Sequence, residues 1–354
     1  MKKIVQPLLQ WYQMNKRILP WRDRHNAYYT WVSEIMLQQT RVEAVKPYFE
    51  RFIEKLPTVE ALRDCEETQL LKLWEGLGYY NRVRNMQKAA AVVCAEYGGE
   101  LPHDVQTLLL LPGIGSYTAG AIASIAYQQP VPAVDGNVLR VLSRLQNARE
   151  DILLDKTKRA AEQTLQEIIS SEAAQQAGDF NQAMMELGAL VCLPQKAAKC
   201  DACPLASCCL AREHKTVEEL PVRIKKVKRK IEERTVLLLD DGTGIAISKR
   251  ADQGLLAGLY ELPNLSGSYE PEEVLEYVKE IGLFPLHIQQ LAAKRHLFSH
   301  VEWRMIGYKV RIEALRERTH ANLLFLDRRE LLTEYPIPSA FEGYLSQIRE
   351  SLIV

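Results

Sequence analysis

The sequence predicts two domains, an all-helical domain followed by an α+β domain, and three observations support this. The chain of 354 residues is about twice the length of a typical single domain. Up to about residue 212 apolar residues recur every three or four positions, as on one face of a helix. Beyond the basic stretch that follows, short alternating segments surround a single helical one. We place the boundaries at residues 1–215, 216–232 and 233–354, the middle range being a basic linker.

Composition excludes some classes of protein. With 47% hydrophobic and 25% charged residues the chain is globular in type, and no apolar run has the length of a membrane span. Lys plus Arg and Asp plus Glu balance at 45 each, so any nucleic-acid site must come from local clustering. The N-terminal stretch lacks a signal-peptide cleavage site. We therefore expect a cytoplasmic protein without membrane partners.

In the helical part, the stretch "SEIMLQQT" places a carboxylate among apolar neighbours. Glu34 is followed by Ile35 and Met36 and has Trp31 one turn behind it. Burial at such a position raises the pKa of a carboxyl and keeps its proton available for acid catalysis. The alternative is a glutamate whose side chain reaches solvent.

The stretch "LPGIGSYTAG", residues 111–120, predicts a helix, a tight turn and a second helix with Tyr117 at its start. Gly113 and Gly115 lack Cβ atoms, and the free N–H groups of the second helix face whatever lies in front of the turn. A phosphate group fits such a turn. A purely structural turn has the same pattern.

The stretch "PAVDGNVLRVLSRL" places Asp135 at the head of a helix, where the dipole and capping bonds favour its ionised form. An aspartate at this position is often only an N-cap. A protonated Glu34 and an ionised Asp135 would together form the pair of carboxyls that cleaves glycosidic bonds.

Five of the seven cysteines lie between residues 192 and 209, which indicates a metal or cluster site in a cytosolic chain. Cys192, Cys200, Cys203 and Cys209 have the spacing x7, x2 and x5. Four thiolates in this arrangement suit a [4Fe-4S] cluster or a structural zinc ion, and spacing alone does not distinguish them.

A basic segment joins the two parts, with six Lys or Arg among the eight residues from Arg223 to Lys230. It is either a solvated linker or a linker that also contacts phosphate. After it, "RTVLLLDDGTGIAISKR" predicts two strands, "EPEEVLEYVKEIGL" a helix and "HVEWRMIGYKVRIEAL" further strands.

The motifs "SEIMLQQT", "GLGYYNRVRN", "LPGIGSYTAG" and "VDGNVLRVLSR", in this order before the cysteines, resemble the helix-hairpin-helix glycosylase superfamily. With the second domain, the chain resembles its MutY-type adenine DNA glycosylases. The resemblance implies removal of adenine opposite 8-oxoguanine or guanine in duplex DNA, with the adenine extruded into a pocket. It makes Glu34 the acid that protonates adenine N7, Asp135 the group that stabilises the sugar cation, and Asn137 and Tyr117 their orienting neighbours.

The resemblance implies further roles. A lysine stands at the position of Tyr117 in relatives with lyase activity, so a tyrosine there implies a glycosylase without it. The seven residues between Cys192 and Cys200 exceed the family's usual six, and we still expect a [4Fe-4S] cluster. The implied contacts are with adenine for Trp21, Arg22 and Gln182, and with the duplex for Gln39, Thr40, Leu77, Tyr79, Gly113 and Gly115.

The second domain resembles the Nudix fold, but its hydrolase pattern is broken. Aligned on Ile281-Gly282-Leu283, the pattern has Leu275 in place of its arginine and Lys279 in place of a glutamate. A metal site containing a lysine binds magnesium poorly, so we expect no hydrolysis. The stretch "HLFSHVEW" instead resembles a lesion-reading loop with Phe298, Ser299 and His300 at its tip, where a hydroxyl can accept the N7 hydrogen of 8-oxoguanine.

Three other functions are compatible with parts of the sequence. Tyr117 argues against a bifunctional pyrimidine glycosylase, and the presence of both Glu34 and Asp135 argues against a DNA-binding module without catalysis. The broken Nudix pattern argues against a nucleotide hydrolase. We expect a monomer that associates with DNA in the nucleoid of a bacterial cell. Its protein partners are not predicted.

Overall fold

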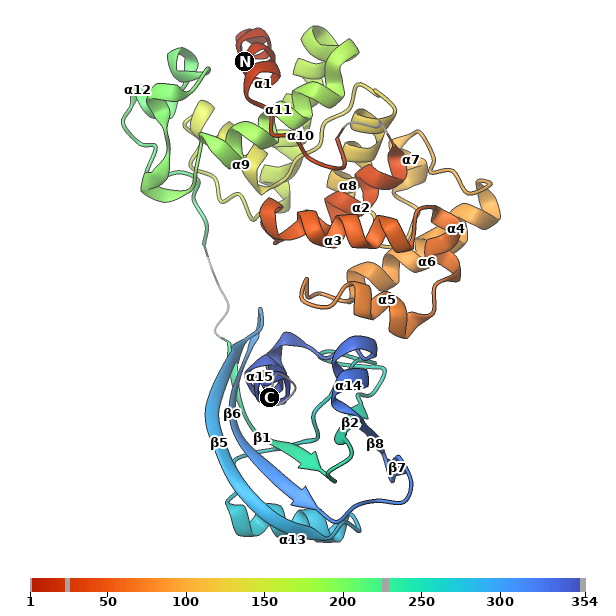
Figure 1. Cartoon of the computed structure of the whole chain (residues 1–354). Helices are drawn as coiled ribbons and strands as arrows, with labels where there is room; N and C mark the ends of the chain where they lie inside the picture. The colour runs from red at the N-terminus through yellow and green to blue at the C-terminus, as the bar shows by residue number, and fades with distance from the viewer. Residues whose placement is uncertain (1, 23–25, 225–228, 351–354) are drawn as a thin grey trace. The chain divides into compact units, whose positions relative to one another are not determined.

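The computed structural model describes residues 2–22, 26–224 and 229–350. The chain forms two compact units, the first comprising residues 1–64 and 84–225 and the second residues 65–83 and 226–354 (Figure 1). The first unit is helical and the second contains the sheet, which confirms the predicted fold class. Residues 225–228 of the predicted basic linker lie outside the described residues.

The first unit consists of α-helices joined by short turns. Its helices are α1 (Val5–Asn15), α2 (Ala27–Leu37), α3 (Val42–Lys55), α4 (Val59–Asp64), α6 (Asn81–Glu96), α7 (Val105–Leu108), α8 (Ser116–Ala121), α9 (Gly136–Leu145), α10 (Asp155–Ile168), α11 (Ala177–Leu190) and α12 (Leu210–Glu213). The first turn of α6 groups with the second unit. Two π-helical turns continue α8 and α10, η2 (Ile122–Ala126) and η3 (Ile169–Ala173). Short 3-10 turns complete it, η1 (Lys2–Ile4), η4 (Ala174–Gln176), η5 (Gln195–Ala197), η6 (Cys200–Ala202) and η7 (Ala206–Cys208).

Helix α11 lies at the centre of this unit and packs against α1 and α9. Phe180, Met184 and Leu187 are all at least 99% buried, as expected of a helix that is apolar on most of its surface. Gly188 lets α9 approach closely, since a Cβ there would lie 2.6 Å from the Cβ of Asn137. This close approach fixes the N-terminal end of α9 against α11.

Helix α2 is also buried along most of its length, from Tyr28 to Met36. The side chain of Asn26 caps it by accepting a hydrogen bond from the Tyr29 N–H, 3.0 Å away. Helix α2 packs against α3, α8 and η2. A polar side chain on the face toward α8 is therefore enclosed by protein.

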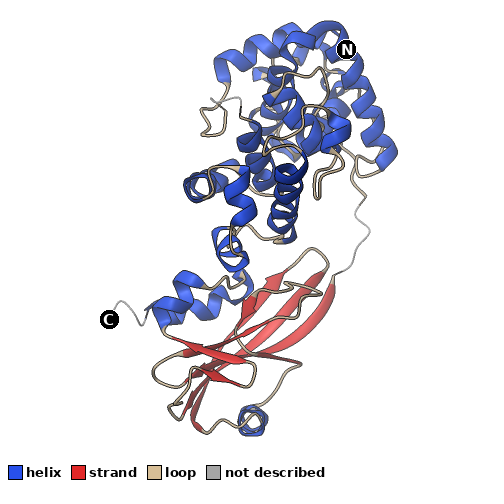
Figure 2. Ribbon diagram, turned by 90° about the vertical axis from the view of Figure 1, so that its right-hand side faces the viewer, coloured by secondary structure: helices blue, strands red, loops and turns tan. Residues whose placement is uncertain are grey.

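The second unit contains the strands, drawn red in Figure 2, which form one mixed sheet. Its strand order is β5-β6-β1-β2-β8-β7. β1 pairs with β6 in parallel, and every other pair of adjacent strands in this order is antiparallel. The strands are β1 (Lys230–Asp240), β2 (Ile245–Lys249), β3 (Tyr260–Glu261), β4 (Asn264–Ser266), β5 (Pro285–Leu297), β6 (Val301–Ile312), β7 (Thr319–His320) and β8 (Leu323–Leu326). The helices are α5 (Glu67–Leu73), α13 (Pro271–Glu280), α14 (Arg328–Glu334) and α15 (Glu342–Glu350), with the 3-10 turn η8 (Ser339–Phe341).

Successive side chains of β1 point to opposite faces of the sheet, and both faces are apolar. Leu237 and Leu239 pack with Val274 of α13, whereas Leu238 packs on the opposite face with Tyr344 of α15. The strands predicted around the Gly-containing turn and the helix predicted after residue 270 are confirmed. Among the described residues no helix is long and apolar enough to cross a membrane.

Candidate active site

A pocket of about 710 Å³ lies in the first unit between α2, α8, α9 and α11. It collects most of the site residues that the sequence analysis placed in this unit. Its lining includes Trp21, Arg22, Glu34, Gln39, Thr40, Tyr117, Asp135, Asn137 and Gln182. Residues that are far apart in the sequence thus face one cavity.

Glu34 is buried in the wall of this pocket, with 6% of its surface exposed. Burial raises the pKa of Glu34 to about 7, and the negative charge of Asp135 acts in the same direction. A hydrogen bond donated by the Tyr117 hydroxyl and the charge of Arg22 oppose this rise. This carboxyl therefore keeps its proton to a much higher pH than an exposed glutamate does.

Tyr117 stands in the first turn of α8, directly after the hairpin, and α8 packs against α2. Burial, followed by the charges of Glu34 and Asp135, raises the pKa of Tyr117 well above its ordinary value. The hydroxyl consequently keeps its proton and acts as a donor toward Glu34. A neutral phenol offers no amine that could attack a sugar.

Asp135 is the N-cap of α9, as the sequence suggested. Its carboxylate accepts hydrogen bonds from the Val138 N–H and from Asn137 Nδ2, each 2.7 Å away. Burial raises the pKa of Asp135 above its ordinary value even though these bonds and Arg140 oppose it. The sequence analysis considered only the capping bonds and the helix dipole, which favour the ionised form. It did not include the burial of Asp135, which raises the pKa.

A chain of hydrogen bonds supports Asp135 from behind. Asn137 donates to Asp135, and its Oδ1 accepts from Arg140 Nη2 at 2.9 Å. Arg140 also donates to the carbonyls of Gly188 and Cys192, at 2.7 and 2.8 Å. The orientation of the Asp135 carboxylate is thereby tied to the end of α11 and to the first cysteine of the group.

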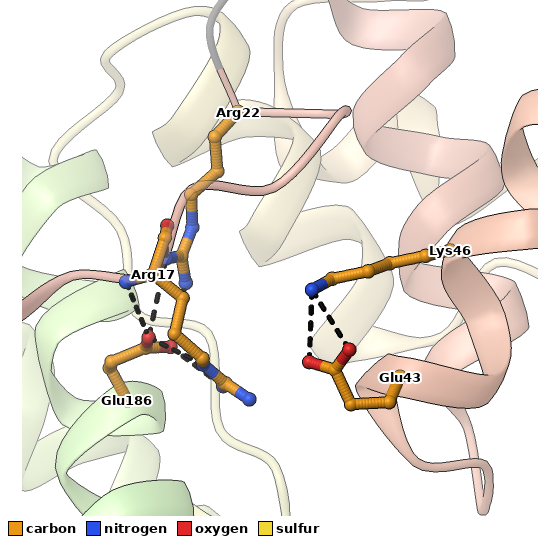
Figure 3. A network of polar contacts seen from close by, with 5 residues as sticks. All are labelled: Arg17, Arg22, Glu43, Lys46 and Glu186. Carbon is orange, nitrogen blue, oxygen red and sulfur yellow. Dashed lines mark hydrogen bonds and ion pairs between the residues drawn. The ribbon is translucent and has the colours of Figure 1, made fainter.

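Glu186 of α11, which also lines the pocket, binds two arginines (Figure 3). Arg17 donates through Nε and Nη2 at 2.7 and 2.9 Å, and Arg22 donates through Nη2 at 2.8 Å. Burial pushes the pKa of Glu186 upward, but these hydrogen bonds outweigh burial and hold it at about 2. The Lys46–Glu43 pair on α3 is a separate contact. Glu186 therefore remains ionised and fixes the guanidinium of Arg22 in the pocket wall.

The hairpin between α7 and α8 contributes Tyr117 but does not line the pocket with its glycines. Gly113 has φ +77°, and a Cβ there would lie 2.7 Å from Asn85 Cβ, so only glycine fits. Gly115 is the N-cap of α8 and has open space around it. Leu110 beside the turn is 78% exposed.

The remaining predicted DNA contacts lie in the second unit. Leu77 is buried, whereas Tyr79 is half exposed and adopts φ +48°, which is uncommon for a residue with a side chain. The Tyr79 hydroxyl and Ser299 Oγ are 2.7 Å apart and share a hydrogen bond. Phe298 packs edge-on against Trp303, so Ser299 and His300 form the exposed part of the predicted lesion loop.

The cysteines gather at the end of the first unit beside its core. Burial raises the pKa of the Cys203 thiol to about 11, and the other three cysteines of the predicted set add to this rise. Arg144 Nη1 lies 3.3 Å from Cys192 Sγ. Among the described residues, no group of three His, Cys, Asp or Glu side chains is arranged to hold a metal ion. The sulfur donors suit a cluster, and the cluster itself remains a prediction.

Several pocket residues were not identified from the sequence. Glu186 lies between Met185 and Leu187 on an apolar helix, the same signal that pointed to Glu34. The arginines Arg17, Arg140 and Arg223 also line the pocket. Their positions depend on contacts between segments distant in sequence, so no local pattern identifies them.

Comparisons with known proteins agree with this geometry. Residues 32–171 match the model of the HhH-GPD superfamily of base excision DNA repair proteins, and residues 234–347 match that of the NUDIX domain. The chain is 35% identical to adenine DNA glycosylase of Rattus norvegicus, covering 92% of this chain and 73% of that protein. It is also 35% identical to that of Buchnera aphidicola, covering 83% of each.

The adenine DNA glycosylase of Arabidopsis thaliana is again 35% identical, and the chain spans 56% of that protein's length. Among solved structures, a thermostable thymine-DNA glycosylase superposes with a TM-score of 0.54 and 26% identity, over 60% of this chain and 97% of that one. A covalent endonuclease III–DNA intermediate gives a TM-score of 0.51 and 26% identity, over 61% and 98%.

Proposed function

Because the chain belongs to the family of adenine DNA glycosylases, we propose that it removes adenine paired with 8-oxoguanine or guanine from duplex DNA, without lyase activity. The observation that carries the chemistry is the buried Glu34, whose pKa is raised to about 7. It accepts the Tyr117 hydrogen bond and faces the same pocket as Asp135, the N-cap of α9. Adenine lies inside the duplex, so it must be extruded to reach this pocket.

In the proposed reaction, protonated Glu34 transfers its proton to N7 of the extruded adenine. The bond between C1′ and N9 then breaks, its electron pair leaves with the base, and the sugar becomes an oxocarbenium ion. Asp135 lies under this cation as a carboxylate. A water adds at C1′ and returns its proton to Glu34, which leaves an abasic site and restores the acid.

Tyr117 and Asn137 orient the two carboxyls in this scheme. Tyr117 donates to Glu34, and Asn137 donates to Asp135 at 2.7 Å. Lyase chemistry requires an amine that forms a Schiff base with the opened sugar. A phenol in the position of Tyr117 cannot supply it, so the product remains an intact strand with an abasic site.

Trp21, Gln182 and Arg22, which line the same pocket as the carboxyls, form the adenine subsite of the proposal. Trp21 is buried and packs edge-on against Phe49, while Gln182 contributes to the lining of the cavity. Arg22 is held by Glu186 at 2.8 Å. A base that enters this subsite meets a flat apolar surface and fixed hydrogen-bonding groups, which is the usual composition of a small-ligand site.

The duplex contacts of the proposal come from three loops. Gln39 and Thr40 follow α2 and line the pocket, and Leu77 and Tyr79 follow α5. In the proposal all four contact the duplex, where side chains that wedge between bases compensate for the lost stacking. Gly113 and Gly115 let the backbone of the hairpin approach a phosphate. Phe298, Ser299 and His300 read the opposing 8-oxoguanine, with Ser299 accepting its N7 hydrogen.

The cofactor of the proposal is a [4Fe-4S] cluster held by Cys192, Cys200, Cys203 and Cys209. The donor set is right in kind, since the four thiols lie close enough for each to affect the pKa of Cys203. Such a cluster, when bound, ties the cysteine loop to the end of α11. The proposal also includes a monomer that acts on DNA in the cytoplasm, and domain boundaries at residues 1–215, 216–232 and 233–354.

The test uses duplexes that carry adenine opposite 8-oxoguanine, guanine, cytosine or thymine, incubated with excess protein and analysed before and after alkali. We expect strand breaks only after alkali and only with the two purines opposite. Borohydride should trap no protein–DNA adduct. The Glu34→Gln variant is the matched control. Breaks without alkali, or equal excision from all four pairs, would contradict the proposal.

A further inference from the structure

The segment between the two domains reaches the catalytic pocket through Arg223. Residues 216–224 belong to the first unit, and hydrogen bonds fix the backbone on both sides of this arginine. The Val222 carbonyl accepts from the Ile152 N–H at 3.2 Å, and the Ile224 N–H donates to Asp151 Oδ2 at 3.3 Å. The loop at residues 151–152 therefore holds Arg223 in place.

The Arg223 side chain lies at the rim of the pocket beside the start of α9. It lines the same cavity as Asp135 and Asn137, and a Cβ on Gly136 would lie 3.8 Å from its Nη2. Its positive charge also contributes to lowering the pKa of Arg140, after the larger effect of burial. The guanidinium thus lies at the first residue of α9, which directly follows Asp135 in the chain.

Arg223 differs from Arg17, Arg22 and Arg140 of the pocket in its partners. Arg17 and Arg22 bind Glu186, and Arg140 binds Asn137 and two carbonyls. Within residues 2–22, 26–224 and 229–350, Arg223 makes no hydrogen bond or ion pair, and it is exposed to solvent. The structural role that Arg17, Arg22 and Arg140 fill does not account for it. Arg41 is the other exposed arginine of the lining, but it lies at the start of α3, whereas Arg223 lies at the start of α9.

Without a nearby anion, the Arg223 guanidinium at the pocket rim would oppose the proposed reaction. A guanidinium near the sugar destabilises an oxocarbenium ion by like-charge repulsion. The substrate supplies the anion, because each nucleotide of DNA carries a phosphate on both sides of its sugar. When the sugar lies over Asp135, one of these phosphates is brought to the start of α9, where the guanidinium lies.

We infer that Arg223 binds the backbone phosphate adjacent to the extruded deoxyadenosine and positions its sugar over Asp135. Arginine suits this task because its planar donors can bind phosphate oxygens in pairs. The inference rests on the proposed function only in that the pocket receives an extruded nucleotide of DNA. It makes the domain-joining segment part of the site, with Arg223 as a positioning residue.

The first experiment measures binding as a function of salt, with a duplex that carries a stable abasic-site analogue in place of the adenosine. Loss of one phosphate contact lowers the slope of log K against log salt by about 0.9. The affinity advantage of the wild-type chain over Arg223→Gln should therefore shrink about 3.5-fold between about 50 and 200 mM salt. Arg223→Lys should recover part of the slope, since an ammonium still pairs with phosphate.

The matched control is Arg159→Gln, which removes an exposed arginine of the same unit that does not line the pocket. It should keep the wild-type slope. Because Arg223 is exposed, its replacement should leave the thermal unfolding midpoint unchanged, and this measurement accompanies each variant. An Arg223→Gln slope equal to that of the wild-type chain would overturn the inference.

The second experiment locates the phosphate by replacing each one around the analogue, in turn, with an uncharged methylphosphonate. The wild-type chain should bind more weakly when one particular phosphate adjacent to the analogue is replaced. Arg223→Gln should bind equally well with and without that replacement, and replacements of other contacted phosphates should weaken its binding as they weaken that of the wild-type chain. An identical profile for both proteins would refute the contact. If the wild-type chain fails to excise adenine but shows the predicted profile, the proposed function fails and the phosphate contact stands.

Discussion

The Tyr117–Glu34 hydrogen bond makes a quantitative prediction about pH. The Tyr117 hydroxyl donates to the Glu34 carboxylate and so lowers its pKa, against the burial that raises it to about 7. A hydrogen bond to a charged group contributes about 1.5 to 3 kcal/mol, and about 1.4 kcal/mol corresponds to one pH unit. Tyr117→Phe should therefore raise the pKa of Glu34, by about one to two pH units.

The assay is single-turnover excision from the adenine–8-oxoguanine duplex, measured across pH with enzyme in excess and ionic strength held constant. The acid form of Glu34 is the active one, so the wild-type rate should fall as pH rises through about 7. In Tyr117→Phe the fall should begin at higher pH. The midpoint is the readout, because the loss of an orienting contact also lowers the plateau.

Tyr127→Phe is the matched control, since its hydroxyl donates to the Leu101 carbonyl at 2.6 Å and does not line the pocket. Its midpoint should equal that of the wild-type chain. A Tyr117→Phe midpoint that stays at the wild-type value, or that moves to lower pH, would refute the reasoning. Either Tyr117 would not stabilise the ionised carboxylate, or Glu34 would not be the acid.

Three further predictions concern other parts of the molecule. Glu34→Gln should reduce the excision rate about 10²- to 10⁴-fold and leave binding of the mismatch intact. Because Glu34 has a pKa of about 7 in the folded chain, the wild-type chain loses stability as pH rises from about 4.5 through 7. At pH 8 the variant should therefore be more stable than the wild-type chain, by up to about 3 kcal/mol in calorimetry. Equal unfolding midpoints at pH 8 would contradict the buried acid. The purified chain should be yellow-brown and contain about four irons, with Cys200→Ser losing them, and one zinc without iron would exclude the cluster. Ser299→Ala with His300→Ala should reduce the ratio of excision rates opposite 8-oxoguanine and guanine about ten- to a hundredfold, and an unchanged ratio would place lesion reading elsewhere.

The parts of the fold that local patterns encode were predictable. The amphipathic segments of the first unit and the helix α13 follow from the spacing of their apolar residues. Strand β5 was not predicted because most of its residues are exposed and its one neighbour, β6, leaves it at the edge of the sheet. The helices α14 and α15 were not predicted either; α15 packs on strands more than thirty residues earlier in the chain.

The same distinction between local patterns and long-range contacts applies to the candidate site. Glu34, Asp135 and Tyr117 stand in short motifs, so sequence could single them out. The burial of Asp135 depends on the approach of α11 to α9, and a capping pattern carries no information about it. Arg223 stands in a charge run that resembles any solvated linker. Its place at the pocket follows from two hydrogen bonds to a loop that lies about seventy residues earlier in the chain.

The opposite tasks of the two carboxyls follow from their partners, since burial raises the pKa of both. Around Asp135 the other contributions, from Val138, Asn137 and Arg140, favour the ionised form. Around Glu34 the charge of Asp135 favours the protonated form and only partly offsets Tyr117 and Arg22. The charge of Asp135 therefore helps to hold the proton on Glu34, and the two carboxyls titrate as a coupled pair. Replacing Asp135 by asparagine should accordingly lower the pKa of Glu34 as well as remove the carboxylate under the sugar. Carboxyl NMR of the free protein would detect this shift without any turnover, and an unchanged Glu34 resonance midpoint would show that the two groups titrate independently.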